Sequence, residues 1–164
     1  MTNTFSPICS KIKKDNKSAK ILYNAYSGYH SELTLSLQYL YHFLYFTAIN
    51  EHETAKTLKQ ILKRKFFNFK LMGNLIDCLG VTPIYAVCIP LKYNFIDKNN
   101  IKRTKIKEKM ILDDIGKEML SLNYYESMLL KLDNEEIISI IKQLKFETKV
   151  HIELLTKHLN TFKK

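Results

Sequence analysis

Three residues with metal-binding chemistry, Glu32, Glu118 and His151, lie where the surrounding sequence otherwise places apolar side chains. Around each of them, apolar residues recur at every third or fourth position, which is the pattern of a helix with one buried face. Inward carboxylates and imidazoles are the groups with which helical bundles hold pairs of iron or manganese ions. The sequence therefore contains part of the ligand set of a buried metal centre.

A lysine and an amide interrupt a further helical pattern, at Lys65 and Asn68. We expect a turn at Asn50, where Asn50 caps the following helix. Glu32 precedes Asn50 by as many positions as Asn68 follows it, and Lys65 lies nearly one helical turn closer to Asn50 than Asn68 does. From the rise per residue of a helix, all three side chains are expected about 25 Å from that turn. The two helices should bring them to one level.

The second half of the chain repeats this arrangement around an expected turn at Asp133. Glu118 precedes Asp133 by as many positions as Thr148 follows it, and His151 lies nearly one helical turn beyond Thr148. Dimetal bundles need one Glu from each of two helices, together with a Glu-x-x-His pair from each of the other two. The spacing therefore predicts a single polar level in the middle of a bundle.

The elements that must position these residues are predicted to be helices. The chain has only four Gly and three Pro in 164 residues, and its long uninterrupted stretches are rich in Leu, Ile and Lys. After an irregular lead-in over residues 1–16, one domain over 17–164 is expected to contain helices at 17–49 (with Gly28 as a weak point), 50–80, 104–132 and 135–162. Residues 81–104 are expected to form a long crossover. An all-α four-helix bundle of two hairpins joined by a crossover follows.

The overall charge of +10, from 26 basic and 16 acidic residues, is typical of a solvated lysine-rich surface. It is also compatible with nucleic acid or an anionic membrane, but no specific partner of either kind is favoured. The stretch RKFFNFK at 64–70 mixes basic and aromatic residues, which on a helix point in different directions. Residues 33–49 carry no formal charge, but polar residues interrupt them, and a buried helix is favoured over a membrane span.

The three cysteines, Cys9, Cys78 and Cys88, contain no CxxC pair, so no zinc ribbon is predicted. Their odd number and the absence of a signal-peptide pattern favour a reducing cytoplasm.

Two stretches resemble a known family. YSGYHSELTLSLQYLYHF resembles the first helix of ferritin-like proteins of the rubrerythrin and manganese-catalase type, and LMGNLIDCLGVTP resembles the end of their second helix. The resemblance extends over about residues 20–160 and implies a ferritin-like bundle. It maps the first-helix and third-helix ligands onto Glu32 and Glu118. The second-helix and fourth-helix pairs fall on Lys65 with Asn68 and on Thr148 with His151.

By this mapping, three of the six ligand positions keep a metal-binding residue: Glu32, Glu118 and His151. The other three positions have lost it and carry Lys65, Asn68 and Thr148. Two divalent ions need more negative charge than two carboxylates supply, so a dimetal redox centre is not favoured. Our hypothesis is that the Lys65 ammonium occupies the place of the metal and balances the two acids. The expected function is a rubrerythrin-like protein with a structural or binding role and no cofactor.

Several alternatives stay open. If Lys65 extends outward past Phe66 or Phe69, then Glu32, Glu118 and His151 are left to hold one Fe or Mn ion in an oxidoreductase acting on peroxide or oxygen. A basic module for nucleic acid or membrane is a further alternative.

Other residues near the expected level have more ordinary interpretations. Glu147 would have to rotate inward to act as a ligand. Tyr39 and Tyr125 are expected beside the polar level as core residues, and His42 and His158 as packing or surface residues. A second apolar stripe on the first helix (Leu33, Leu37, Leu40 and Leu44) predicts a cover by the amino-terminal segment or by a homodimer partner.

Overall fold

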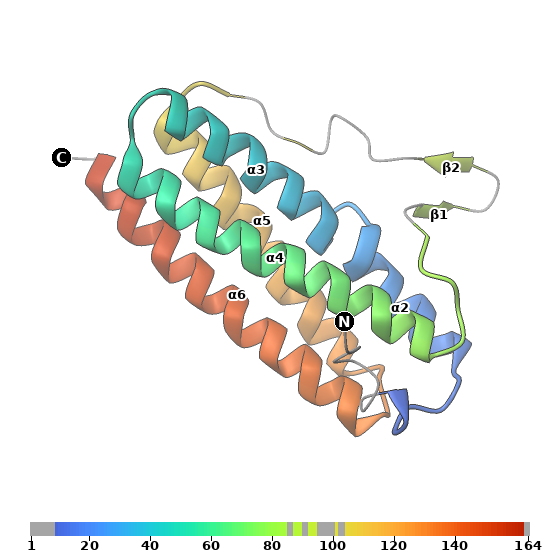
Figure 1. Cartoon of the computed structure of the whole chain (residues 1–164). Helices are drawn as coiled ribbons and strands as arrows, with labels where there is room; N and C mark the ends of the chain where they lie inside the picture. Colours follow the sequence, from blue (N-terminus) through green and yellow to red (C-terminus); the bar gives the residue numbers. More distant parts are fainter. Residues whose placement is uncertain (1–8, 85–86, 90–91, 95–100, 102–103, 163–164) are drawn as a thin grey trace.

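The computed structural model describes residues 9–84, 87–89, 92–94, 101 and 104–162. Its helices and strands are α2 (Asn16–Ser27), α3 (Glu32–Ala48), α4 (His52–Cys78), β1 (Val87–Ile89), β2 (Lys92–Asn94), α5 (Lys107–Leu129) and α6 (Glu135–Phe162). Helices α3 to α6 lie along one another as a bundle, and α2 continues beyond the start of α3 (Figure 1). The prediction of an all-α bundle is confirmed, with one short antiparallel hairpin of β1 and β2 inside the crossover.

The first predicted helix, over 17–49, is wrong as a single element because it breaks between Ser27 and Glu32. Gly28 has extended backbone angles, and its N–H still donates to the Asn24 carbonyl. Ser31 then caps α3 by accepting a hydrogen bond from the Thr34 N–H at 3.1 Å, and the Thr34 hydroxyl donates to the Gly28 carbonyl at 2.9 Å. Capping by serine is favourable enough to start a new helix here. The break places Glu32 at the first residue of α3.

The other helix ends lie within a few residues of the predicted positions, although one predicted cap is not formed. Asn50 does not cap α4: it adopts a left-handed conformation with φ 60°, which asparagine tolerates, and Glu51 takes the cap position. Gly80, with φ 85°, ends α4 as predicted, because its N–H bonds to the Asp77 carbonyl. Helix α5 is shorter than the predicted 104–132, whereas α6 spans the predicted 135–162.

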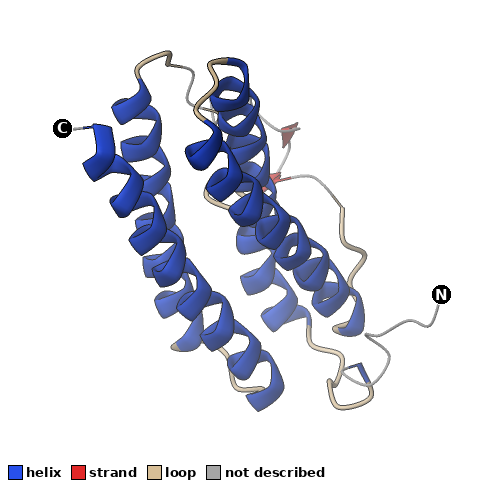
Figure 2. Cartoon of the chain, turned by 60° about the vertical axis from the view of Figure 1, so that its left-hand side comes forward, coloured by secondary structure: helices blue, strands red, loops and turns tan. Residues whose placement is uncertain are grey.

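The helices pair into two antiparallel hairpins, α3 with α4 and α5 with α6, and Figure 2 shows the two pairs side by side. The crossover between them begins at the end of α4 and reaches α5 at the opposite end of the bundle (Figure 1). Much of the predicted 81–104 segment lies outside the described residues. The possibility that this segment covers the polar level therefore concerns residues that the structure does not describe. None of the helices in the described part of the chain combines the length and hydropathy needed to cross a membrane.

The apolar core is divided into two clusters. One cluster joins α2 to the second half of α4 and to the hairpin end of α5 and α6, with Leu22, Met72 and Leu144 fully buried. The other joins α3 to the first half of α4 and to the opposite ends of α5 and α6, with Leu35, Leu58 and Leu155 fully buried. The buried polar side chains of the predicted level lie between the two clusters.

A disulfide joins Cys9 to Cys78 and ties the amino-terminal segment to the end of α4. Ile12 is buried in the first core cluster, and the Asp15 N–H donates to the Leu79 carbonyl at 3.1 Å, so the same segment is also held by non-covalent contacts. Disulfides persist in oxidising environments. The pairing therefore weighs against the expectation of a reducing compartment.

The disulfide leads to the first prediction. Cross-linking residues 69 apart should stabilise the fold by about 4 kcal/mol through the lost entropy of the unfolded chain. We expect Cys78→Ser to lower the urea midpoint of the oxidised protein and to abolish the effect of added reductant on it. The matched control is Cys88→Ser, which should leave both unchanged. A urea midpoint of the wild-type protein that does not change on addition of reductant would contradict the Cys9–Cys78 pairing.

Candidate functional site

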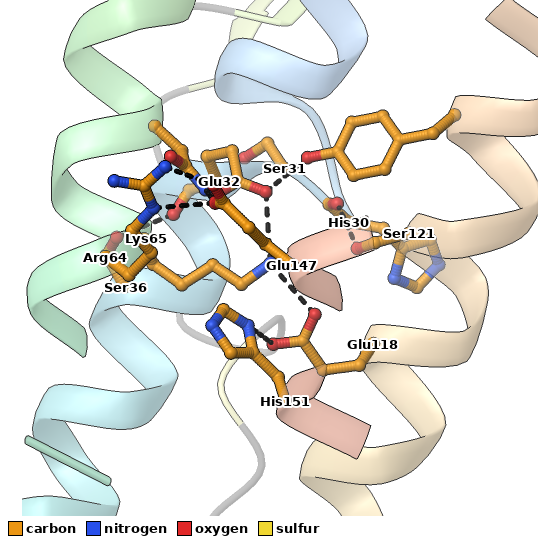
Figure 3. Close-up of polar contacts among 12 residues, drawn as sticks. His30, Ser31, Glu32, Ser36, Arg64, Lys65, Glu118, Ser121, Glu147 and His151 are labelled. Atoms are coloured by element: carbon orange, nitrogen blue, oxygen red, sulfur yellow. Dashed lines mark hydrogen bonds and ion pairs between the residues drawn. The ribbon is translucent and has the colours of Figure 1, made fainter. Parts of the chain in front are cut away.

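The centre of the bundle holds an ammonium group between two carboxylates. The Nζ atom of Lys65 lies 3.1 Å from Oε1 of Glu32 and 2.9 Å from Oε2 of Glu118. Glu32 comes from α3, Lys65 from α4 and Glu118 from α5, and the three side chains point toward one another (Figure 3). We call Glu32, Lys65, Glu118 and His151 the Lys65 centre.

All three charged groups are sealed from solvent, since Lys65, Glu32 and Glu118 are at most 1% exposed. The sequence alternative in which Lys65 extends outward is therefore wrong. Burial by itself lowers the pKa of Lys65, but attraction to Glu118 and Glu32 outweighs it and raises that pKa to about 12. Burial likewise raises the pKa of Glu118, but Lys65 and His151 outweigh it and lower that pKa to about 2. Lys65 and Glu118 are thus charged at neutral pH.

Two buried tyrosines complete the hydrogen bonds of the carboxylates. The Tyr39 hydroxyl donates to Oε1 of Glu118 at 2.8 Å, and the Tyr125 hydroxyl donates to Oε1 of Glu32. Burial, followed by the nearby carboxylates, raises the pKa of both phenols well above the usual value. Both tyrosines are therefore neutral donors that hold the two carboxylates in place.

The fourth helix contributes a histidine to the centre. Nδ1 of His151 lies 3.3 Å from Oε1 of Glu118, and the ring is almost fully buried (Figure 3). Thr148 lies nearly one turn earlier on α6 and is also buried. The structure therefore brings Glu32, Lys65, Glu118, His151, Tyr39 and Tyr125 together from four helices.

Asn68 is hydrogen-bonded to a carboxylate outside the Lys65 centre. Its Nδ2 atom donates to Oε2 of Glu147 at 3.1 Å. Arg64 binds the same carboxylate with two nitrogens, through Nε at 2.7 Å and through Nη2, and Gln143 donates to it at 3.0 Å. Burial raises the pKa of Glu147, but these three donors outweigh burial and lower it. Glu147 is consequently bound within the α4–α6 seam by Arg64, Asn68 and Gln143.

Comparison with known proteins identifies the architecture. Two structures of KatB, a manganese catalase from Anabaena, superpose with a TM-score of 0.82 at 16% and 17% identity, covering 93% of this chain and 75% and 76% of theirs. A bacterioferritin from Rhodobacter capsulatus, described with a metal-free dinuclear site and haem iron, superposes with a TM-score of 0.77 at 17% identity, covering 93% of this chain and 89% of its own. This chain has the ferritin-like fold. No protein-family model matches it, and no curated protein matches it significantly.

The residues of this ferritin-like bundle do not fit two metal ions. Among the described residues, no three His, Cys, Asp or Glu side chains are grouped so that they could hold one ion. At the Lys65 centre an ammonium lies within 3.1 Å of both carboxylates, where a cation would have to bind. A metal there would have to displace Lys65, which would leave its charge buried beside another cation.

A second buried polar network, which the sequence did not predict, lies between α3 and α5. His42 is fully buried, and its Nδ1 lies 2.8 Å from Oδ2 of Asp114. Nε2 of Gln38 lies 2.8 Å from Nε2 of His42, and the Lys117 ammonium donates to Oε1 of Gln38 at 3.0 Å. Since an amide nitrogen only donates, Nε2 of His42 accepts the shorter contact from Gln38, and Nδ1 faces the Asp114 carboxylate. Of the two expected roles for His42, packing or surface, the surface role is wrong, because His42 is buried within this network.

The remaining sequence features are partly buried and partly exposed. In the second apolar stripe of α3, Leu33 is buried, whereas Leu40 is 37% and Leu44 is 56% exposed. In RKFFNFK, Phe69 is buried and stacks on Tyr26 with ring centroids 4.7 Å apart, while Phe67 lies beneath the Arg64 guanidinium. The phenylalanines of this stretch therefore do not form one surface on which bases can stack.

Removal of the central ammonium supplies the second prediction. Lys65→Met strands two buried carboxylates and should lower the free energy of unfolding by about 3–5 kcal/mol. In the Lys65→Met background, adding Glu32→Gln and Glu118→Gln should recover most of this loss, because no buried charge then remains unpaired. Urea unfolding at neutral pH measures both. A loss below about 1 kcal/mol in Lys65→Met would show that the ammonium is not what balances the acids.

The lowered pKa of Glu118 gives the third prediction. The pKa of this carboxyl is about 2 in the folded protein, compared with its ordinary value of 4.5. The contribution of Glu118 to stability is therefore complete above pH 4.5 and is lost as the pH falls toward 2. We expect the wild-type free energy of unfolding to fall across this window. Glu118→Gln should show a shallower fall over the same range, and equal slopes for the two proteins would contradict the assignment.

Proposed function

We propose that this is a rubrerythrin-like protein of the ferritin-like fold in which the Lys65 ammonium replaces the metal of a dimetal centre. In this proposal the protein has no redox turnover and serves a structural or binding role. The observation that carries it is the position of Nζ, 3.1 Å from Glu32 and 2.9 Å from Glu118. An ammonium at these distances supplies positive charge between the two acids.

The donor set supports the same proposal. Of the six positions that the resemblance assigns to ligands, Lys65, Asn68 and Thr148 carry no carboxylate or imidazole. Asn68 is engaged by Glu147, and Glu147 is engaged by Arg64. Neither of these side chains is available to replace a missing ligand without breaking its present contacts. We therefore favour a protein without a cofactor. If it does bind one, iron or manganese is the expected metal.

Metal uptake is the fourth prediction and tests the proposal directly. Purified protein incubated with iron or manganese and then desalted should contain no stoichiometric metal by elemental analysis. The triple variant Lys65→Glu, Asn68→His and Thr148→Glu restores the missing ligand types and should take up metal. Lys65→Met serves as the control, since it removes the ammonium without adding a ligand.

Two outcomes would overturn this proposal. Stoichiometric iron or manganese in the wild-type protein that disappears in Glu32→Gln would sink the idea that the ammonium replaces the metal. A folded triple variant that takes up no metal would contradict the assignment of Lys65, Asn68 and Thr148 to ligand positions.

A metal-binding oxidoreductase acting on peroxide or oxygen is the second candidate. Its support is an unused acceptor: Oε2 of Glu32 is buried and has no hydrogen-bond partner among the described residues. In this candidate Glu32, Glu118 and His151 would hold one ion after Lys65 moves away. The first outcome above, metal that depends on Glu32, is the result that favours it.

The partner and location follow from surface and cysteine chemistry. We infer a homodimer because the exposed Leu40 and Leu44 on α3 leave part of an apolar stripe uncovered. A cytoplasmic location would rest on the odd number of cysteines, and the Cys9–Cys78 disulfide weighs against it.

A further inference from the structure

A repeated pattern of basic and aromatic residues lies on the outer surface of α4 and α6. On both helices, a lysine, a phenylalanine and a second lysine follow one another at the spacing i, i+4 and i+7. Residues at this spacing share one face of a helix. All six residues are exposed, Phe67 by 42% and Phe146 by 62%. They are Lys63, Phe67 and Lys70 on α4 and Lys142, Phe146 and Lys149 on α6, and we call them the Lys–Phe face.

The two copies of the pattern lie side by side. Helices α4 and α6 run antiparallel next to each other (Figure 1), and Nε of Arg64 donates to Oε2 of Glu147 across the seam at 2.7 Å. The same guanidinium lies 4.8 Å from the centroid of the Phe67 ring, and Phe146 directly precedes Glu147 in the sequence. Phe67 and Phe146 are therefore at nearly the same depth along the bundle.

The four lysines surround these two rings. Because the helices are antiparallel, Lys63 of α4 lies level with Lys149 of α6, and Lys70 lies level with Lys142. The rise of a helix separates these two levels by about 10 Å, and packed helices are about 8–10 Å apart. The ammonium groups thus stand at the corners of a nearly square area with the aromatic rings in its middle.

The positive charge of the Lys–Phe face is not balanced within the protein. None of its four lysines forms a salt bridge with a described residue. Glu147 is the one carboxylate within residues 63–70 and 142–149, and Arg64 already binds it with two nitrogens. The face therefore has a surplus of about four charges beside exposed aromatic carbon. It is complementary to a partner that is anionic outside and apolar beneath.

The arrangement favours a lipid bilayer over other anionic partners. Proteins that bind single-stranded nucleic acid do so in a groove whose cations follow the backbone, whereas these lysines are spread over an area on the outside of two helices. A second copy of the chain would bring four more lysines against the first four. Anionic headgroups form a two-dimensional layer of negative charge, and the acyl chains below them accommodate aromatic rings.

We propose that the Lys–Phe face binds the surface of a bilayer that contains anionic phospholipid. The four ammonium groups contact headgroup phosphates, while Phe67 and Phe146 enter the boundary between headgroups and acyl chains. The bundle then lies on the membrane with α4 and α6 parallel to its plane. This inference goes beyond the proposed role of Lys65 and holds whether or not the bundle takes up a metal.

The fifth prediction is that the wild-type protein co-sediments at low salt with vesicles of phosphatidylcholine and phosphatidylglycerol, but not with vesicles of phosphatidylcholine alone. A lysine near an anionic surface strengthens binding roughly fivefold. Replacing all four lysines of the Lys–Phe face by alanine should therefore weaken binding at least about a hundredfold. A matched control, which should weaken it far less, replaces four exposed lysines elsewhere by alanine: Lys17, Lys20, Lys109 and Lys131.

The depth of the rings can be measured separately, because the chain has no tryptophan. In Phe67→Trp and in Phe146→Trp, the emission maximum should move to shorter wavelength on addition of the anionic vesicles, since the indole leaves water. The control Leu112→Trp, at an exposed position of α5, should show no such shift. Replacing both Phe67 and Phe146 by serine should weaken binding about tenfold at unchanged charge. Urea midpoints verify that all variants are folded.

The proposal is overturned if the wild-type protein does not bind anionic vesicles at low salt, or if the two quadruple alanine variants lose affinity equally. It is also overturned if neither tryptophan of the Lys–Phe face shifts its emission in vesicle-bound protein. Tighter binding to a single-stranded oligonucleotide than to the vesicles would assign the face to nucleic acid instead. A dimer that dissociates in the double serine variant would assign it to a second copy. None of these readouts depends on metal content.

Discussion

The buried ammonium of Lys65 is the interaction on which the middle of this bundle depends. Two carboxylates from different hairpins converge on it, so the contact also joins α3 to α5 through α4. The desolvation of three charges is large, and their mutual attraction offsets it only because the geometry is close and Tyr39 and Tyr125 supply further hydrogen bonds. Without the ammonium, two buried acids would face each other across the hairpins. The arrangement is therefore more important for how the hairpins fit together than for net stability.

The ferritin-like fold makes it geometrically simple for one ammonium to meet two carboxylates. Each of the four main helices places one side chain at the same depth, so a ligand position on one helix always faces ligand positions on the others. A lysine on α4 is long enough to reach carboxylates on both α3 and α5. Around this level the α4–α6 seam is closed by Arg64 and Glu147, and the α3–α5 seam by His42 and Asp114. Both seams between the hairpins are thus polar near the middle of the bundle.

The sequence allowed the bundle and the depth of its polar level to be predicted, because both depend on helical period and on distance from turns. The break at Gly28 was not predicted as a break, since it depends on Ser31 and Thr34 capping a new helix. Arg64 with Glu147, and His42 with Asp114, lie beside the inward stripes, where helical period alone does not indicate a partner. The disulfide could not be predicted from the sequence either, because three cysteines allow several pairings and their spacing does not select one.

The division of the apolar core has a consequence for how the sequence can vary. Leucines and isoleucines at one end of the molecule belong to a different cluster from those at the other end, and the polar level intervenes. A change of volume at one end therefore acts first on neighbours in the same cluster. Substitutions in one cluster can therefore accumulate independently of substitutions in the other. The charged residues of the polar level between the two clusters contact one another, so they must change together.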